Sequence, residues 1–473
     1  MRAPAFAKLL IPAPLVMLTL LACTSTPDRG DEAGSASAGD TRPRPSAQVR
    51  TGAAALGDDW RGDAPGVRRL IRSSDLPAPT MAVSDPEASS GKPAKVIPRP
   101  QGAAPKVPEG FAVDVLASGF KQPRRFRIAP NGDVFLSESG AGRVLVFPAA
   151  SVRSASVKPE VFAEGLDRPY GIAFYPPTDP KYVYVAAANQ VVRYPYQSVT
   201  RKAAGPAEVI IDGIPTKRHW TRDLAISQDG KRLFVAVGSA SNLGVNGMPE
   251  LPPEDIRAFE KTHGRGAAWG EETNRAVVRV FDPEGKNVRN YATGLRNCSG
   301  LAMQPGSDNL WCVVNERDHL GPDLNPDFMV RVQDRAFYGW PWYTIGNTED
   351  PALKGERPDL KGEARVPEVL FQAHSSALGL AFYDSDAFPA EYRGDAFVAL
   401  HGSHTRPQMT GYKVVRVRMK GGMPTGEYED FMTGFVVDNS TVWGRPAAVA
   451  VARDGTLLVA DDANGTIFRV TRK

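Results

Sequence analysis

One segment pattern occurs six times between residues 111 and 473, and it limits the chain to a repeat fold. Each copy opens with a short apolar run that usually ends in Gly, as in FAVDVLASG. Two apolar runs joined by a turn follow, as in RDLAISQDGKRLFVAV, and a β-branched run such as AVVRVF closes the copy. Short runs rich in Val, Ile, Phe and Tyr, separated by Gly, Pro, Asn or Asp, are typical of antiparallel strands.

Four strands per copy and six copies predict an all-β fold, a six-bladed β-propeller, over residues 110–473. The chain ends on GTIFRV, which is a third strand without a fourth after it. The repeat region begins on FAVDVLASGF, which is a fourth strand without a third before it. We therefore expect this N-terminal strand to complete the last blade and to close the ring by hydrogen bonding.

The region before the repeats is predicted to be a lipoprotein leader and a tether. Positive charge at the start precedes an apolar stretch, residues 9–21, that is too short to span a bilayer comfortably. The string LLAC resembles a bacterial lipobox, which predicts a signal peptide over residues 1–22 and a lipid on Cys23. An ordinary signal peptide cut elsewhere is the alternative. Residues 23–109 are rich in Ala, Gly, Ser, Pro and charge, and we expect a disordered tether there.

The same leader predicts the location and partners of the chain. Thr24 rather than Asp follows the cysteine, which by analogy with bacterial lipoproteins favours the outer membrane, facing the periplasm. Contact with the membrane is then expected through the lipid anchor only. The net charge of +4 is weak and scattered, which argues against nucleic acid as a partner.

Two cysteines remain after Cys23, and both flank one predicted hairpin. Cys298 and Cys312 could pair in an oxidising envelope or remain two buried thiols. A simple hairpin register places Ala302 rather than Cys298 opposite Cys312, so both interpretations stay open.

Polar residues gather in loops that should share one face of the propeller. The loops that lead into the innermost strands, and those that join the second and third strands, lie on the same face of a four-stranded meander. Five of the six histidines fall in or beside these loops. So do five arginines: Arg124, Arg222, Arg296, Arg406 and Arg445. Cations around a central pocket favour a polyanionic ligand, bound by charge-assisted and often bidentate hydrogen bonds.

Several long strings in these loops resemble the glucose/sorbosone dehydrogenase family, and the L-sorbosone dehydrogenase-like branch in particular. They are HWTRDLAISQDGKRLFVAVGSASN, GLRNCSGLAMQP, LWCVVNERDHLGPDLNPDFM, FYGWPW, HGSHTRPQMTGYKVVRV and GRPAAVAVARDGTLLVADD. Members of this family are soluble six-bladed propellers that use pyrroloquinoline quinone (PQQ). The resemblance implies a PQQ- and Ca²⁺-dependent dehydrogenase that oxidises an aldose or a sugar aldehyde. It also implies an envelope electron acceptor, either a quinone or a cytochrome.

The resemblance assigns a role to each matching residue. His219 matches the general base that takes the proton from the anomeric hydroxyl, while hydride passes to the PQQ quinone carbonyl. Arg296 matches the arginine beside that carbonyl, and Asn297 the adjacent asparagine. Gly321 and Pro322 match a pair whose backbone carbonyls hold Ca²⁺. The residues that match cofactor contacts are Arg124, Arg296, His401, Arg406 and Arg445.

The chain also departs from the best-known branch of that family. Ser239 stands where an aspartate orients the base histidine, and His404 stands where relatives often have Trp. The lysine that pairs with PQQ has no direct equivalent, and Arg406 or His401 could replace it. The insertion at residues 243–274 is long for a loop and could be a lid, a substrate wall or a decorated edge.

Two other functions fit the sequence less well. One is a lipid-tethered propeller that binds a sugar or a protein without redox chemistry, and the missing aspartate favours it. The other is a metal-dependent lactonase, which would need Glu, Asp and Asn ligands around the axis. Its candidate ligands are Glu138, Asn315, Glu316 and Asp461. Taken alone, Asp461 and Asp462 are interpreted as turn-stabilising residues.

Overall fold

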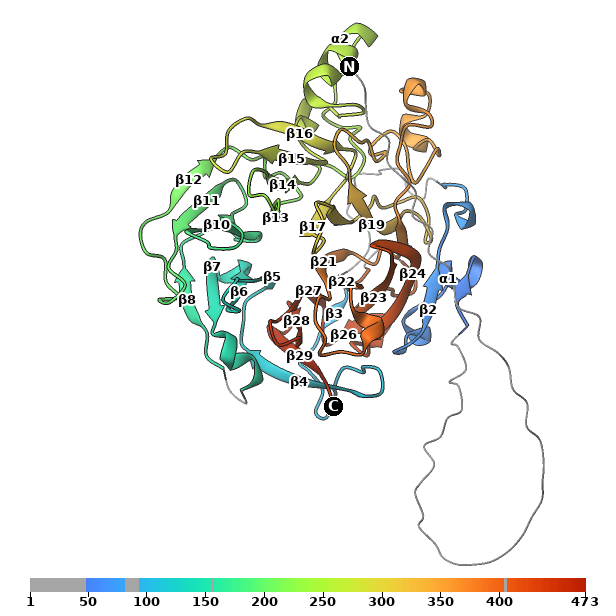
Figure 1. Ribbon diagram of the computed structural model, residues 1–473. Coiled ribbons are helices and arrows are strands. Elements are labelled where there is room, and N and C mark those ends of the chain that lie inside the picture. Colours follow the sequence, from blue (N-terminus) through green and yellow to red (C-terminus); the bar gives the residue numbers. More distant parts are fainter. Residues whose placement is uncertain (1–47, 81–92, 155–156, 404–405) are drawn as a thin grey trace, which may run out of the picture. The chain divides into compact units, whose positions relative to one another are not determined.

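The computed structural model describes residues 48–80, 93–154, 157–403 and 406–473. The predicted signal peptide, Cys23 and His404 lie outside these residues. Within them the protein is all-β, as expected, with seven sheets that follow one another in chain order (Figure 1). Five of the seven contain four consecutive antiparallel strands, and a sixth combines three consecutive strands with one from earlier in the chain.

Four of these sheets hold only consecutive strands. The first contains β5 (Pro123–Ile128), β6 (Val134–Glu138), β7 (Arg143–Phe147) and β8 (Glu160–Ala163). The second contains β9 (Ile172–Tyr175), β10 (Tyr182–Ala186), β11 (Val191–Pro195) and β12 (Glu208–Ile211). The third contains β13 (Leu224–Ile226), β14 (Leu233–Val237), β15 (Val277–Phe281) and β16 (Arg289–Thr293). The fourth contains β17 (Cys298–Met303), β18 (Leu310–Val314), β19 (Pro326–Val332) and β20 (Val369–Ala373).

The last two sheets also take strands from the N-terminal part of the chain. The fifth contains β21 (Ala377–Phe382), β22 (Ala396–Leu400), β23 (Lys413–Lys420) and β24 (Met423–Met432), extended by β2 (Arg68–Leu70) and β1 (Arg50–Thr51). The sixth contains β27 (Pro446–Val451), β28 (Leu457–Asp461), β29 (Thr466–Arg472) and β4 (Phe111–Ser118). A small seventh sheet joins β25 (Val436–Asp438), β26 (Thr441–Val442) and β3 (Lys95–Val96).

The first strand of the repeat region pairs with the last strand of the chain. β4 runs antiparallel to β29, with Phe111 opposite Arg472 and Ser118 opposite Thr466. The first strands of the six main sheets also contact one another in sequence, from β5 through β9, β13, β17 and β21 to β27, and β27 contacts β5 again. These six strands therefore surround a common centre.

The burial of the second strand in five of the main sheets explains why the sequence shows continuous apolar runs. β6, β14, β18, β22 and β28 are buried along their whole length. A strand covered on both faces by neighbouring sheets needs apolar residues on both faces rather than in alternation.

An ion-paired cluster fills the centre between the first strands. Asp223 is fully buried and pairs with Arg125 and Arg127 of β5. Its carboxylate also accepts the backbone N–H of Leu301 in β17 at 2.6 Å. Arg127 Nη2 donates to the carbonyls of Leu224 and Leu301 at 2.8 and 2.9 Å. The cluster thus ties the first, third and fourth sheets together.

Cys298 and Cys312 form a disulfide, which decides between the two interpretations left open by the sequence. The register of β17 against β18 shifts between Cys298 and Gly300, so that Leu301, and not Ala302, lies opposite Cys312. This β-bulge was not visible in the sequence, and it explains why a simple hairpin register argued against the pairing.

The expectation of a disordered tether is wrong for residues 48–80 and 93–109. β2 pairs antiparallel with β24, and α1 (Ala53–Leu56) buries two of its residues and contacts β20 of the fourth sheet. Arg69 is fully buried and pairs with Asp58, Asp63 and Asp430 at 2.7, 2.8 and 2.8 Å. Composition did not reveal this segment because its few apolar residues give no periodic pattern and its strand pairing and one of its Arg69 ion pairs involve residues far along the chain.

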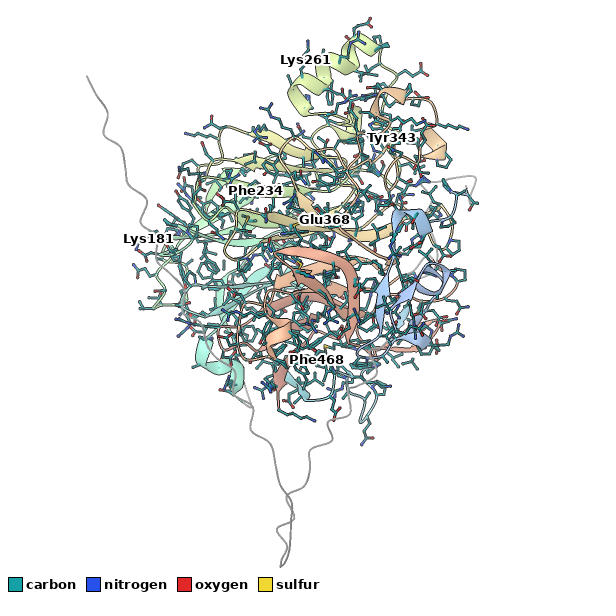
Figure 2. The ribbon with its side chains drawn as sticks, turned by 45° about the vertical axis from the view of Figure 1, so that its right-hand side comes forward. Lys181, Phe234, Lys261, Tyr343, Glu368 and Phe468 are labelled. Carbon is teal, nitrogen blue, oxygen red and sulfur yellow. A yellow bond between two sulfur atoms is a disulfide. The ribbon has the colours of Figure 1, made fainter. Side chains whose placement is uncertain are left out.

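The insertion at residues 243–274 lies at the outer edge of the third sheet. Its helix α2 (Pro253–His263) projects outward beyond β15 and β16 (Figure 1). Figure 2 shows Lys261 of this helix at the periphery, with Tyr343 of a second long connection below it. The insertion and that connection share an aromatic core that includes Trp269, Phe337 and Trp342. Among the described helices, none is long and apolar enough to cross a membrane.

The Arg69→Met variant tests whether the N-terminal segment is part of the folded domain. Removing one member of a buried ionic network leaves uncompensated charge and should cost about 3–5 kcal/mol of unfolding free energy. Urea unfolding measures this loss. The matched control is Arg61→Met, since the Arg61 side chain is 59% exposed in its pair with Asp59. Equal midpoints for Arg69→Met and the wild type would contradict this account.

Candidate functional site

A cavity of about 260 Å³ lies where the loops before the first strands meet the loops after the second strands. It brings together five residues predicted for catalysis or cofactor binding: Arg124, His219, Arg296, Asn297 and His401. Asn315 and Glu316, two of the candidate lactonase ligands, also line it. The remaining lining residues are Arg218, Thr221, Asn315, Glu316, Asp318, Asp327, His374, Ser376 and Leu378. The expected convergence of histidine and arginine on one face is therefore present.

A second cavity of about 450 Å³ lies at the opposite ends of the same first strands. Its lining is mostly apolar, and Arg127 is the charged residue among the side chains that line it. Because the two cavities use opposite ends of β5, β9, β13, β17, β21 and β27, the Asp223 cluster lies between them. Acid–base chemistry belongs to the first cavity, which holds the histidines and carboxylates.

His219 is held in one tautomer by Ser239. Its Nδ1 lies 2.9 Å from the backbone oxygen of Ser239 and 3.0 Å from Ser239 Oγ. Because a carbonyl oxygen can only accept, Nδ1 carries the proton and Nε2 is left as the basic nitrogen. Ser239 Oγ in turn donates to the Ser241 carbonyl at 2.7 Å. Ser239 thus binds His219 Nδ1 through its backbone oxygen, at the position where the family resemblance predicts an aspartate.

The charge state of His219 also suits a base. Burial, followed by the charges of Arg296 and Arg218, holds the pKa of His219 well below its usual range, although the Ser239 carbonyl opposes the shift. The imidazole is therefore neutral at physiological pH. A neutral imidazole is the form that accepts a proton.

Arg296 is buried, and its guanidinium is held by backbone and amide oxygens from two loops. Nη2 donates to Asn242 Oδ1 at 2.9 Å, and Nη1 donates to the Glu316 carbonyl at 2.8 Å. Asn242 is the residue that precedes the insertion, so the insertion begins at a contact with Arg296. Asn297 Oδ1 accepts from Thr221 Oγ1 at 3.4 Å.

Arg124, His401 and Arg445 are joined through Asp462. The Asp462 carboxylate lies 2.8 Å from Arg124 Nη2 and 2.7 Å from His401 Nε2. Arg445 Nη2 donates to His401 Nδ1 at 2.9 Å, which fixes His401 as the Nε2–H tautomer. Burial and the charge of Arg445 lower the pKa of His401 to about 4, although Asp462 opposes this.

Asp462 is the site residue that sequence reasoning missed. Asp461 does stabilise a turn, as expected, because its carboxylate accepts from the backbone N–H groups of Arg445 and Ala463. The Asp462 carboxylate instead binds Arg124 and His401, and Arg445 joins this group through its hydrogen bond to His401. The available signal was its position in a loop after a second strand, on the same face as the arginines.

Four predicted ligands are not among the described residues that line the cavity: Arg406, Arg445, Gly321 and Pro322. Arg445 is connected to the lining through its hydrogen bond to His401. Arg406 Nη2 donates to Asp323 at 2.9 Å and to the Leu56 carbonyl at 3.2 Å. The Arg406 guanidinium is therefore engaged by a contact with the N-terminal segment. The Gly321 carbonyl lies 3.1 Å from His374 Nε2, and Pro322 adjoins it. In the described part of the chain, no group of three or more His, Cys, Asp or Glu residues is arranged to hold a metal ion.

The lining is suited to an anion with several acceptor groups. Arg124 Nε is buried and finds no acceptor within the described ranges, which leaves a donor available beside the cavity. Burial raises the pKa of Glu316 to about 7 and that of Asp327 to about 6, although Arg296 lowers the former and a backbone N–H the latter. These carboxyl groups therefore carry less negative charge than ordinary ones. The residues present thus fit a polycarboxylate such as PQQ.

The sequence of the chain is similar to those of several known proteins. It is 24% identical to an uncharacterised protein of Borreliella burgdorferi, over 77% of this chain and 90% of that one. It is 22% identical to the pyrroloquinoline quinone-dependent pyranose dehydrogenase of Coprinopsis cinerea, over 77% of this chain and 54% of that protein. The chain therefore spans about half the length of that relative.

A solved structure has the same fold. The holo form of the pyranose dehydrogenase PQQ domain from Coprinopsis cinerea superposes with a TM-score of 0.62 at 21% identity, covering 79% of this chain and 98% of that domain. The TrAA12-like family model matches residues 105–331 and 355–473. The chain therefore belongs to the TrAA12-like family, and the resemblance to PQQ-dependent sugar dehydrogenases is confirmed.

Proposed function

We propose that the protein is a PQQ-dependent dehydrogenase that oxidises an aldose or a related sugar aldehyde. The observation that carries this proposal is the presence of His219, with Nε2 as its basic nitrogen, in one cavity with Arg124 and Arg296. A base and two cations in one enclosed site suit removal of a proton from a sugar hydroxyl next to an anionic cofactor.

Each residue has a defined task in this proposal. PQQ, when bound, supplies the quinone that accepts hydride from the sugar carbon. His219 Nε2 accepts the proton of the anomeric hydroxyl. Arg296, already fixed by Asn242 and Glu316, provides positive charge where negative charge develops. Arg124, ordered by Asp462, binds a cofactor carboxylate, while His401 and Arg445 hold that wall of the cavity.

The six main sheets are inferred to be six blades of a closed propeller. The circular series of contacts between the first strands supports this count, and the pairing of β4 with β29 supports closure within the last blade. In this arrangement the 260 Å³ cavity opens at one end of the central channel.

Ca²⁺ is part of the proposal on the family resemblance alone, and no chemical step is assigned to it. The Gly321 carbonyl is engaged by His374 Nε2, which also contacts Asp318 through Nδ1 at 3.1 Å. This carbonyl thus already has a hydrogen-bond partner, and within the described ranges no group of three or more His, Cys, Asp or Glu side chains is arranged to hold a metal ion. Gly321 and Pro322 are proposed as ligands on the resemblance alone.

The cellular setting is proposed from the sequence. A lipid on Cys23 would anchor the protein in the bacterial cell envelope, with the outer membrane facing the periplasm as the proposed location. A quinone or a cytochrome of the envelope is the proposed electron acceptor.

Reconstitution tests the proposed function directly. Purified protein is titrated with PQQ, with and without CaCl₂ and after chelation, and dye reduction is measured with a panel of aldoses. We expect saturable PQQ binding and sugar-dependent dye reduction. PQQ binding without oxidation of any carbohydrate would favour the non-redox binding module, and absence of both would contradict the proposal. Activity that survives chelation would remove Ca²⁺ from it.

The His219→Gln variant tests the base. Loss of positioned proton transfer should lower kcat about 10²–10⁴-fold, while the Kd for PQQ stays within a few-fold of the wild type. The matched control is His263→Gln, since His263 lies on α2 and stacks on Phe259. An unchanged kcat in His219→Gln would exclude His219 as the base.

The Arg124→Gln variant tests recognition of the cofactor. A lost charge-assisted hydrogen bond is worth about 1.5–3 kcal/mol, so the Kd for PQQ should rise about 10- to 150-fold. Arg168→Gln is the matched control. Both Arg124 and Arg168 lie over the Trp220 ring, but Arg168 is not among the residues that line the cavity. Equal affinities for PQQ in the two variants would be inconsistent with the assigned role.

A further inference from the structure

Arg275 is a buried arginine whose hydrogen bonds all run to backbone carbonyls of two site loops. It lies between the short helix η5 (Gly270–Glu272) and β15, at the C-terminal end of the insertion. Only 2% of the residue is exposed. Nε donates to the Gly238 carbonyl at 3.0 Å, and Nη2 donates to the Ser239 carbonyl at 2.8 Å. Nη2 also contacts the carbonyls of Lys217 and His219.

The Ser239 carbonyl oxygen therefore accepts from two donors at once. The oxygen lies 2.9 Å from His219 Nδ1 and 2.8 Å from Arg275 Nη2. An oxygen with two lone pairs can satisfy both donors, and each donor restricts rotation of the peptide group that the other needs. Arg275 thus holds the acceptor that selects the His219 tautomer.

Glu272 binds the same loop through hydrogen-bond donors of that loop. Its carboxylate accepts the backbone N–H of Ala240 at 2.8 Å and the hydroxyl of Ser241 at 2.6 Å. Glu272 and Arg275 together bind the N–H and C=O groups of the loop that carries Ser239. A loop held at several consecutive peptide groups keeps one backbone conformation, which a single contact does not ensure.

A second buried arginine restrains the backbone of His219 itself. Arg222 is fully buried, and its Nη1 donates to the carbonyls of His219 and Thr221 at 2.8 and 2.7 Å. The His219 carbonyl therefore accepts from both Arg222 and Arg275. Arg222 acts on the loop of His219, whereas Arg275 links that loop to the loop of Ser239.

We propose that Arg275 is a positioning residue for His219: it fixes the Ser239 carbonyl on Nδ1 and so keeps Nε2 as the basic nitrogen. The inference rests on the proposed function for the catalytic meaning of His219, but the geometry it invokes concerns the protein alone. The proposal also gives the insertion at residues 243–274 a role in ordering the site. Asn242, which precedes it, binds Arg296, and Arg275, which follows it, binds the carbonyl that contacts His219. In this view a cation and a carbonyl replace the carboxylate that orients the base in relatives.

The decisive experiment combines nitrogen NMR with steady-state kinetics on Arg275→Met. In cofactor-free protein labelled with ¹⁵N-histidine, the His219 signals are assigned by their loss in His219→Gln. We expect one Nδ1–H tautomer in the wild type and both tautomers in Arg275→Met. In the PQQ-loaded protein we expect kcat to fall about 10- to 100-fold, with the KM for sugar and the Kd for PQQ within about threefold.

Two further variants keep the inference falsifiable. Arg279→Met is the matched control, because Arg279 lies on β15 and stacks over Phe281 instead of contacting the Ser239 loop. Arg275→Lys is used if Arg275→Met does not fold, and it should give an intermediate tautomer ratio and kcat. An unchanged tautomer in a folded Arg275 variant would overturn the inference, as would the same changes in Arg279→Met.

Failure of the proposed function gives a different result. If the wild type binds no PQQ and oxidises no sugar, the proposed function is contradicted. The tautomer of His219 in the cofactor-free variants still decides whether Arg275 positions His219.

Discussion

The buried ion cluster around Asp223 is the interaction on which the arrangement of the site depends. One carboxylate binds Arg125 and Arg127 from the first sheet and a backbone N–H from the fourth. Sheets that meet only through apolar side chains can slide, whereas charge-assisted hydrogen bonds fix direction as well as distance. Arg124 lies at the start of β5, and the loops that carry His219 and Arg296 lead into β13 and β17, so the relative positions of the three residues follow from the cluster.

Around this centre, the protein repeatedly binds backbone carbonyls with buried guanidinium groups. Arg222, Arg275 and Arg296 each donate to main-chain oxygens of site loops. Loops with few apolar residues cannot be ordered by burial, and the planar donor set of arginine can order several peptide groups at once. Burial lowers the pKa of His219 most, and the positive charges of Arg296, Arg218 and Arg275 lower it further. Positive charge near the cavity also suits an anionic cofactor.

Much of the fold and part of the site could be predicted from the sequence. Strand runs and turn residues are local signals, so the sheets and the pairing partner of residues 111–118 were accessible. The bulge at Cys298, the ion pairs of Arg69 and the contact of Arg406 with Leu56 depend on residues far apart in the chain. The role of Asp462 depends on three sheets meeting, which no local pattern encodes.

The pairing of β4 with β29 has a consequence for how the protein is made. β4 is synthesised long before β29, its hydrogen-bonding partner. Until β29 is made, that edge of β4 has no partner, and contacts between segments so far apart form slowly because a long loop must close. The sixth sheet can therefore be completed only after β29 has been synthesised, and until then the unpaired edge of β4 is a site where misfolding can begin.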